Sequence, residues 1–453
     1  MKRSTFDLTQ PGWSILLAIT VLMAIGVASI YVTDTHYAAG HDGPQNAAKQ
    51  VVRALVSVIA AMIVLKLGYL RIAHFAYVIF GVVLIGLVPL VVAKKLNTTF
   101  GGLIPEINGA FRWIRMPGFP IQPSEFMKLA YILLLAWYLR NRKSYRRFSG
   151  LMLPFLMALV PAGLILLEPD LGTVILLGVV LFVMLFVAGA KIWHLTVIIM
   201  MGAAVAPFAW DQITGYQRAR ITAVLLQNDG LRRAVIEEPE RYRKLATKRQ
   251  ALEWAASSGY QLVHSKNALG SGGFFGYGWG RGTYVQNNRL PDRHNDFIFA
   301  IVGHQWGFVG CLVVLGCYMT IAVAGVMIAW ANTEPVGRLL AVGVVTLIAA
   351  QVVINVGMTV GLMPITGMNL PFLSYGGSSL LTNFIAVGLL VSVSQHRPFQ
   401  LSAKPFEFGR PRKRAMATEH GWRKDGRCPA CRYDLTGNTS GVCPECGKRI
   451  ELM

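Results

Sequence analysis

The sequence is poor in charged residues. Only 14% of its 453 residues are Asp, Glu, Lys or Arg, whereas soluble domains carry roughly 25%, so an ordinary soluble enzyme is excluded. Acidic residues are scarcest, 22 against 43 Lys and Arg. No basic soluble segment of useful size accompanies this excess, which argues against a nucleic-acid partner. The chain also lacks an evident internal repeat, which argues against a transporter built from inverted repeats.

What the chain has in abundance is apolar runs of about 20 residues, the length that crosses roughly 30 Å of hydrocarbon. We therefore expect an all-α, polytopic membrane protein of ten transmembrane helices. The first run follows Met-Lys-Arg but is too long for a signal peptide. The expected spans are residues 13–32, 49–67, 71–93, 123–140, 151–168, 171–190, 192–210, 297–330, 338–362 and 378–395.

Basic residues in short loops set the expected orientation. Residues 140–147 carry five basic residues and no acid, so this loop should be cytoplasmic. Both termini then lie in the cytoplasm of a multi-pass protein of the cytoplasmic membrane, and the large loop 211–296 lies outside. Within that loop, residues 240–254 have the spacing of a helix. The remaining positive charge suits contact with anionic membrane lipid.

The C-terminal part differs in composition and divides the chain. We expect a membrane domain at 1–397, a basic cytoplasmic linker at 398–427 and a zinc-ribbon at 428–449. Two C-x-x-C pairs supply four thiolates, a set that suits a structural Zn²⁺ site with no open position. Disulfides are not expected in the reducing cytoplasm. The zinc ligands would be Cys428, Cys431, Cys443 and Cys446.

A polar loop enters the membrane within residues 290–310 and leaves Asp296 at the boundary. Asp296 could simply cap the following helix. The residues near Asp296 in the sequence favour a functional role. The Gly-rich run 268–282 can approach a ligand closely, and nearby cations can hold an anion. These cations are Lys266, Arg281, Arg289 and Arg293, with Arg112 and Arg115 from another outside segment.

Other ionisable residues at membrane depth are functional candidates by default. Glu125 and Lys128 are three residues apart at a helix start and can pair, so holding the helix and binding substrate are equal alternatives for Glu125. Asp170 follows a short turn, where capping the next helix is the simpler interpretation and a place on a cavity floor the functional one. His304 stands alone in its spacing, which favours packing over metal binding.

Five stretches together resemble the SEDS family (shape, elongation, division and sporulation proteins), which contains RodA and FtsW. They are GAFRWIRMPGFPIQPSEFMKLA (109–130), EPDLGT (168–173), YQLVHSKNALGSGGFFGYGWGRGT (260–283), LPDRHNDFIFAIVG (290–303) and NVGMTVGLMPITGMNLPFLSYGGSSLL (355–381). Features of both subgroups occur, and we favour RodA. The Gly- and Pro-rich part of the last stretch cannot form a helix and should line a cavity.

The resemblance implies a ten-helix peptidoglycan glycosyltransferase that polymerises lipid II outside the cytoplasmic membrane. The family works with a class B penicillin-binding protein and other cell-wall proteins. Its essential aspartate falls on Asp296. Its other motif residues fall on Arg112, Trp113, Glu125, Lys128 and Asp170.

The implied chemistry suits these residues. An inverting transfer from a lipid diphosphate to a sugar hydroxyl needs one base for the acceptor proton and cations for the leaving diphosphate. Asp296 would be that base, or a ligand of a divalent cation such as Mg²⁺ or Mn²⁺. Two alternatives remain open: a lipid II flippase, and a non-catalytic scaffold of the cell-wall complex.

The chain departs from the family in three places. Where the family has G-E-E-L-G, residues 303–307 read Gly-His-Gln-Trp-Gly, without the two acids. The outside loop carries an extra charged segment at 229–256. The cysteine-rich tail is not a core family feature and could dock a cytoplasmic partner.

Overall fold

The computed structural model describes residues 11–37, 45–107, 110–116, 119–140, 147–210, 215–257, 259–286, 290, 294–395 and 431. The chain divides into two units, Met1–Ala403 and Lys404–Met453, and the second is described only at the exposed Cys431. The zinc ligands expected at Cys428, Cys443 and Cys446 therefore lie outside the described residues.

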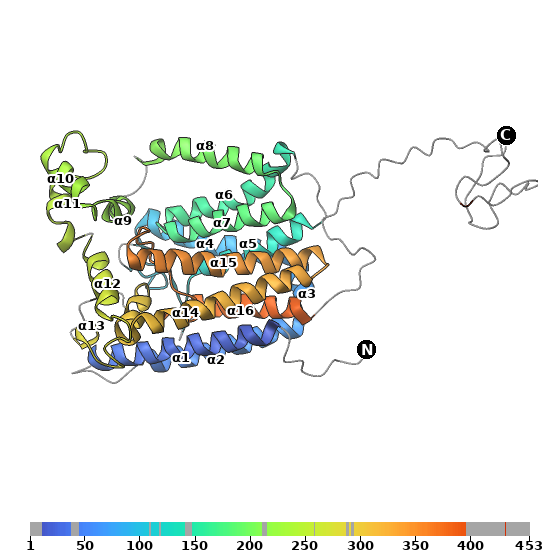
Figure 1. Ribbon diagram of the computed structural model, residues 1–453. Coiled ribbons are helices and arrows are strands. Elements are labelled where there is room, and N and C mark those ends of the chain that lie inside the picture. The colour runs from blue at the N-terminus through green and yellow to red at the C-terminus, as the bar shows by residue number, and fades with distance from the viewer. Residues whose placement is uncertain are drawn as a thin grey trace, which may run out of the picture. The chain divides into compact units, whose positions relative to one another are not determined.

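The first unit is almost entirely helical (Figure 1). Its α-helices are α1 (Pro11–Tyr37), α2 (Gln45–Leu67), α3 (Tyr69–His74), α4 (Ala76–Leu96), α5 (Pro123–Leu139), α6 (Met152–Leu167), α7 (Leu171–Ala188), α8 (Ile192–Trp210), α9 (Gly215–Leu225), α10 (Asp229–Glu237), α11 (Lys248–Leu252), α12 (Tyr260–Ser271), α13 (Thr283–Gln286), α14 (Ile298–Ala331), α15 (Pro335–Val360) and α16 (Gly377–Gln395). The other elements in the described ranges are two 3₁₀ turns, η2 (Phe148–Leu151) and η3 (Trp254–Ala256), and one antiparallel hairpin of β1 (Ile114–Met116) and β2 (Phe119–Ile121).

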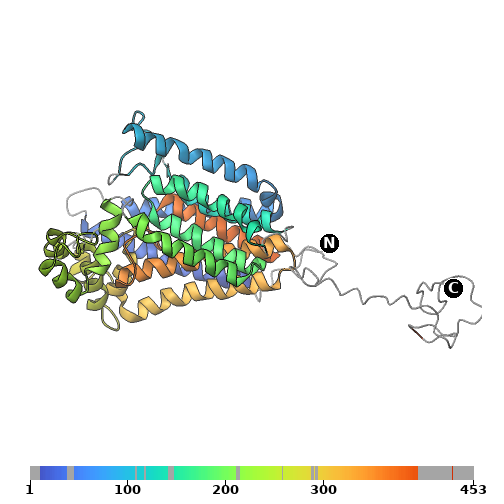
Figure 2. The same ribbon diagram turned by 90° about the horizontal axis from the view of Figure 1, so that it is seen from above.

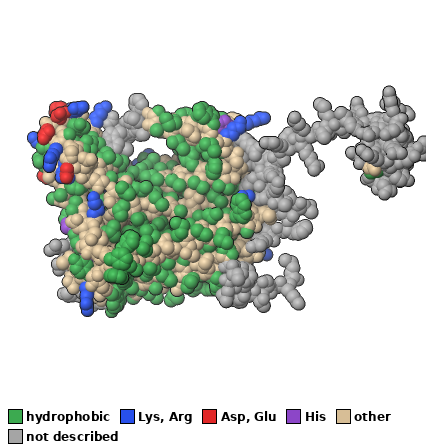
Figure 3. Space-filling model, in the orientation of Figure 1, with side chains coloured by type: hydrophobic (Ala, Val, Ile, Leu, Met, Phe, Trp, Pro, Cys, Tyr) green, Lys and Arg blue, Asp and Glu red, His purple; other side chains and the backbone are tan. Residues whose placement is uncertain are grey.

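Eight helical segments of the described chain are long and apolar enough to cross a membrane. They include α1, α2, α4, α7, α14, α15 and α16, and the eighth runs from η2 through α6. The α5 helix, with 17 residues, and the described apolar part of α8, Ile192–Val205, are shorter. Figure 3 shows hydrophobic side chains along the flank of the bundle, whereas charged side chains gather at one end. The protein is therefore a polytopic membrane protein.

The bundle is built around α15 and α16. The apolar window of α16 is 83% buried and that of α15 is 67% buried, whereas only 17% of the α2 window is buried. The α15 helix packs against α5, α7, α14 and α16, and α16 packs against α2 (Figures 1 and 2). Peripheral helices leave Leu, Val and Ile exposed because lipid, unlike water, solvates those side chains.

The α14 helix is kinked at Gly307, whose backbone is not helical (φ 63°, ψ −157°). A break inside a membrane helix leaves amide and carbonyl groups that must find partners. Here the Gly-rich segment after α12 supplies them by backbone hydrogen bonds. These run from Tyr277 N to His304 O (3.1 Å), from Gly278 N to Gln305 O (2.9 Å) and from Phe308 N to Gly273 O (2.9 Å).

The glycines of this segment are required by its contact with α14. A Cβ on Gly276 would lie 2.2 Å from Gln305 O, and one on Gly282 would lie 2.2 Å from His304 Nε2. The close approach that these glycines make in the structure is to the kinked helix. His304 is buried, with Nδ1 2.9 Å from Ser271 Oγ, which confirms a packing role.

The extra charged segment folds at the end of the bundle as α10, α11 and η3 (Figure 1). A single helix over 240–254 is wrong. Thr247 and Gln250 form a capping box, so the short helix α11 begins after Thr247 and does not continue a helix from residue 240. Trp254 anchors the segment by donating from Nε1 to Ala223 O at 2.9 Å, and it belongs to a small hydrophobic core.

Candidate active site

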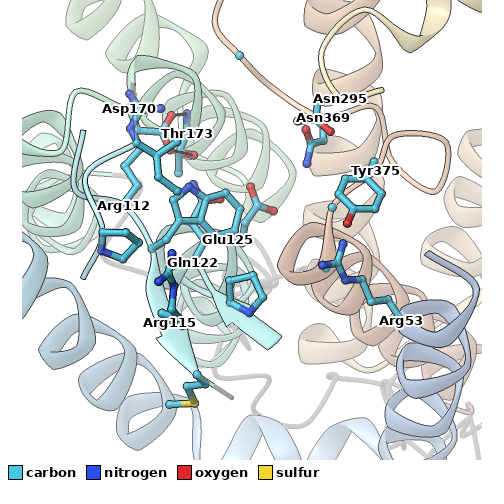
Figure 4. A pocket seen from close by; sticks show the side chains of 18 of the residues that line it. Arg53, Arg112, Arg115, Gln122, Glu125, Asp170, Thr173, Asn295, Asn369 and Tyr375 are labelled. Atoms are coloured by element: carbon cyan, nitrogen blue, oxygen red, sulfur yellow. Dashed lines mark hydrogen bonds between the residues drawn. The ribbon is translucent and has the colours of Figure 1, made fainter. Parts of the chain in front are cut away.

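A cavity of about 900 Å³ opens where α2, α5, α7 and α14 meet the hairpin and the non-helical chain before α16. Figure 4 shows its two sides, with Arg112, Arg115, Glu125 and Asp170 on one and Arg53, Tyr375 and Asn295 on the other. The segment between α15 and α16 contributes Gly367, Met368 and Asn369, as its composition predicts. The charged side chains that line the cavity are Arg53, Arg112, Arg115, Glu125, Asp170 and Asp296.

Asp296 is half-buried, just before the first turn of α14. Three consecutive backbone carbonyls fix the chain here, and two of their donors come from the segment before α16. The bonds run from Tyr375 N to His294 O (2.8 Å), from Ser374 Oγ to Asn295 O (2.6 Å) and from Asn355 Nδ2 to Asp296 O (2.9 Å). Anchoring of this kind holds a reactive side chain in one place before substrate arrives.

The Asp296 carboxylate faces Gly367, a residue in the left-handed region (φ +74°). A Cβ on Gly367 would lie 3.4 Å from Asp296 Oδ2 and 3.2 Å from Arg220 Nη1. Glycine therefore leaves room for the Asp296 carboxylate, just before α14, and for the guanidinium of Arg220 on α9. Arg220 was not among the residues predicted from the sequence, because its approach to Asp296 depends on the fold of the outside loop.

Arg112 and Trp113 precede strand β1 and line the cavity, as the resemblance implies. Arg112 is held from behind by the turn between α6 and α7. Its Nε donates to Glu168 O at 2.8 Å, and Nη2 donates to Pro169 O. These two bonds fix the guanidinium plane, and no carboxylate of the described residues is bonded to it.

Both interpretations of Asp170 hold in the structure. The side chain caps α7, accepting from Thr173 N (3.2 Å) and Thr173 Oγ1 (2.9 Å). Although buried, Asp170 also borders the cavity.

Glu125 and Lys128 form the ion pair that their spacing predicts, with Nζ 2.7 Å from Oε1. Lys128 is buried beneath the surface, whereas Glu125 borders the cavity. Removing one partner would leave an uncompensated buried charge, which is strongly destabilising.

Two predicted cations do not line this cavity in the described part of the chain. Lys266 is exposed on α12 and bonds to Gln227 Oε1 at 3.3 Å beside a separate small pocket. Arg281 is exposed beyond the Gly-rich segment. For Arg281 the cause is the packing of the Gly-rich segment against α14, whereas Lys266 is carried to the other pocket by α12. Arg293 and Arg289 lie outside the described residues.

Arg53 was missed by the sequence reasoning. It lies on α2 and lines the cavity, with its Cζ 4.6 Å from the centre of the Tyr375 ring. An arginine within an apolar run is the signal that could have found it, since ionisable residues at membrane depth are expensive. It adds a third guanidinium to the cavity wall.

A divalent cation would take few ligands from the protein here. Within the described ranges, no three His, Cys, Asp or Glu side chains are grouped to hold a metal. Mg²⁺ often binds through one or two carboxylates and substrate phosphates, and Asp296 could supply one carboxylate. Arg220 already places a positive charge near the Asp296 carboxylate, where a bound cation would lie.

The chain is similar to proteins of known family over most of its length. The FtsW/RodA/SpoVE family, described as "Cell cycle protein", matches residues 13–398. The probable peptidoglycan glycosyltransferase FtsW of Trichlorobacter lovleyi is 33% identical, over 86% of this chain and 95% of that protein. Stage V sporulation protein E of Bacillus subtilis is 33% identical, over 86% and 98%. The peptidoglycan glycosyltransferase RodA of Treponema pallidum is 31% identical, over 84% and 96%.

Solved structures agree with the sequence relatives. A chain from a peptidoglycan synthase complex, in work on the coordination of polymerisation and crosslinking, superposes with TM-score 0.66 at 27% identity, covering 86% of this chain and 98% of that one. Thermus thermophilus RodA superposes with TM-score 0.59 at 26% identity, again over 86% and 98%. Relatives named FtsW and RodA match at similar identity, so the comparisons do not separate the two subgroups. The chain belongs to the SEDS family of FtsW, RodA and SpoVE.

Proposed function

We propose that this protein is a peptidoglycan glycosyltransferase that polymerises lipid II into glycan strands, and that Asp296 is its general base. One observation carries the proposal: a carboxylate fixed by its backbone opens onto a cavity lined by three guanidiniums. The cavity is large enough for sugar and diphosphate groups. The names of the relatives support the same activity.

The reaction is a single displacement. Asp296 accepts the proton of the acceptor sugar hydroxyl, whose oxygen attacks the anomeric carbon of the lipid-linked sugar. The bond between that carbon and the diphosphate oxygen breaks, and the configuration inverts. The departing diphosphate takes the electron pair, and Arg53, Arg112 and Arg115 stabilise its charge. In the alternative role, Asp296 would not be the base but would hold a divalent cation, Mg²⁺ or Mn²⁺, which would supply positive charge for the diphosphate.

The proposal includes ten membrane spans. The α5 and α8 helices join the eight longer spans as shorter ones, which suits their apolar composition. An even number of spans places both termini on the same side, and the basic loop at 140–147 makes that side the cytoplasm of a bacterium. The cavity then opens on the extracytoplasmic side, where the α9–α13 segment also lies.

The family and its solved structures also indicate which proteins this chain binds. The structural relative from a synthase complex supports pairing with a crosslinking enzyme, which we propose is a class B penicillin-binding protein. The four tail cysteines suit a structural Zn²⁺, and we propose that this unit docks a cytoplasmic protein. Deleting 398–453 should then alter localisation and leave polymerisation unchanged.

The test uses the purified full-length chain in detergent with lipid II and measures glycan chain length, with and without a crosslinking partner. Wild-type protein should form polymer, and Asp296→Asn should lose at least about 100-fold of the rate. Asp229→Asn, at an exposed acid of α10, is the matched control and should behave as wild type. Polymer formation by Asp296→Asn would refute the assignment. Absence of polymer from the wild type under all conditions would favour the flippase or scaffold.

A further inference from the structure

Glu168 is a buried acid that the mechanism does not use. It lies in the short turn between α6, which ends at Leu167, and Asp170, the cap of α7. The residue is fully buried, and neither carboxylate oxygen has a hydrogen-bond partner among the described residues. An ionised carboxylate in that position would be very costly, because nothing replaces its hydration.

Two cations approach the same turn without bonding to the carboxylate. Arg112 donates to the backbone carbonyls of Glu168 and Pro169. Lys94, in the last turn of α4, donates from Nζ to Leu167 O at 2.7 Å. Peptide carbonyls thus hold both cations, and neither positive charge is cancelled by a direct ion pair with Glu168.

The electrostatic surroundings keep this acid protonated. Burial, with the charge of Asp170 adding to it, raises the pKa of Glu168 to about 9, while Arg112 and Lys94 act in the opposite direction. On α5, Lys128 pairs with Glu125 Oε1 at 2.7 Å. Near neutral pH the side chain is therefore an uncharged carboxylic acid.

We propose that Glu168 is a positioning residue that works in its neutral form and keeps the charge of Arg112 available to an anionic substrate. Neutral, it leaves the guanidinium on the backbone carbonyls and facing the cavity. Ionised, it would attract Arg112 into the turn and cancel the charge that the diphosphate needs. The inference rests on the proposed function for its effect on catalysis, but the protonation of Glu168 can be tested without any substrate.

The first test is infrared spectroscopy of the purified wild-type protein and of Glu168→Gln. The wild type should show the carbonyl stretch of a buried protonated carboxylic acid at pH 7, and the band should disappear as the pH passes about 9. Glu168→Gln should lack the band. Glu106→Gln, at an exposed acid, is the control and should keep it. If the variant fails to fold, the pH titration of the wild type still decides. No protonated-acid band at pH 7 would overturn the proposal.

The second test is the pH profile of lipid II polymerisation. Wild type and Glu106→Gln should lose activity as pH rises through about 9, whereas Glu168→Gln should equal wild type at pH 7 and keep its rate at higher pH. A purely structural role would lower the rate of Glu168→Gln equally at every pH. Coincident profiles for all three proteins would also overturn the proposal. If none polymerises lipid II, the proposed function fails, while the infrared result stands separately.

Discussion

Replacing Glu168 by glutamine should stabilise the protein at neutral pH. The side chain is ionised in the unfolded chain, where its pKa is near 4.5, and must take up a proton on folding because burial raises the folded pKa to about 9. Each pH unit between these values adds about 1.4 kcal/mol of penalty. At pH 7 the penalty is therefore about 3 kcal/mol. Glutamine has a similar shape and no charge to lose.

The sign of the pH dependence is the sharper part of this prediction. A group whose pKa is raised by folding favours the folded state below its unfolded pKa, and this stability is lost as pH rises toward the folded pKa. The advantage of Glu168→Gln should thus be about 3 kcal/mol at pH 7 and fall below about 1 kcal/mol at pH 5. Below pH 4.5 the two proteins should be equally stable.

The assay is unfolding in one detergent, followed by tryptophan fluorescence, at pH 5 and pH 7. Glu106→Gln controls for the loss of a carboxylate, since its side chain is exposed, and should unfold with the wild type at both pH values. Two results would show that the acid is ionised in the folded protein. One is a Glu168→Gln variant that is no more stable than wild type at pH 7, and the other is a gain in unfolding free energy that does not change with pH.

Three further predictions concern other parts of the chain. Gly276→Ala should lower the melting temperature and polymerisation, because its Cβ would lie 2.2 Å from Gln305 O, whereas Gly81→Ala, in open space on α4, should not. Arg112→Lys should reduce the polymerisation rate at least about 10-fold, since an ammonium cannot reproduce the planar fork on two carbonyls; an unchanged rate would contradict this role. Metal analysis of the purified protein should find one zinc per chain, and deletion of 398–453 should remove it.

The sequence predicts the parts of the fold that depend on local pattern. Each expected span falls on a helix to within a few residues at most ends, except that 71–93 begins in the short helix α3 and continues in α4. Length and hydropathy decide where membrane helices form. The pairing of Glu125 with Lys128 is equally local, since residues three apart share a helix face. The capping of α7 by Asp170 follows from its place before the first turn.

What the sequence could not predict depends on contacts between distant segments. Arg220 and Asp296 belong to distant segments, yet both lie within 3.4 Å of the point that a Cβ of Gly367 would occupy. Lys266 looked equally suitable by charge and by distance along the chain, yet α12 carries it to another pocket. Sequence spacing supplies the kinds of residue that a diphosphate needs, and tertiary packing selects which of them face it.

The same distinction explains how this chain can differ from its family at His304 and Gln305. The Gly-rich segment bonds to the backbone carbonyls of these two residues, and any amino acid presents those carbonyls. The kink at Gly307 and the glycines opposite it are constrained, because a Cβ there would meet backbone atoms. The backbone hydrogen bonds between the Gly-rich segment and α14 hold the first turns of that helix, and with them Asp296. These bonds therefore do not require acids at 304 and 305. Replacing His304 by glutamine and Gln305 by methionine, which keeps both buried side chains uncharged, should leave the fold of this segment intact. A collapse of folding would show that the imidazole and the amide are themselves essential to it.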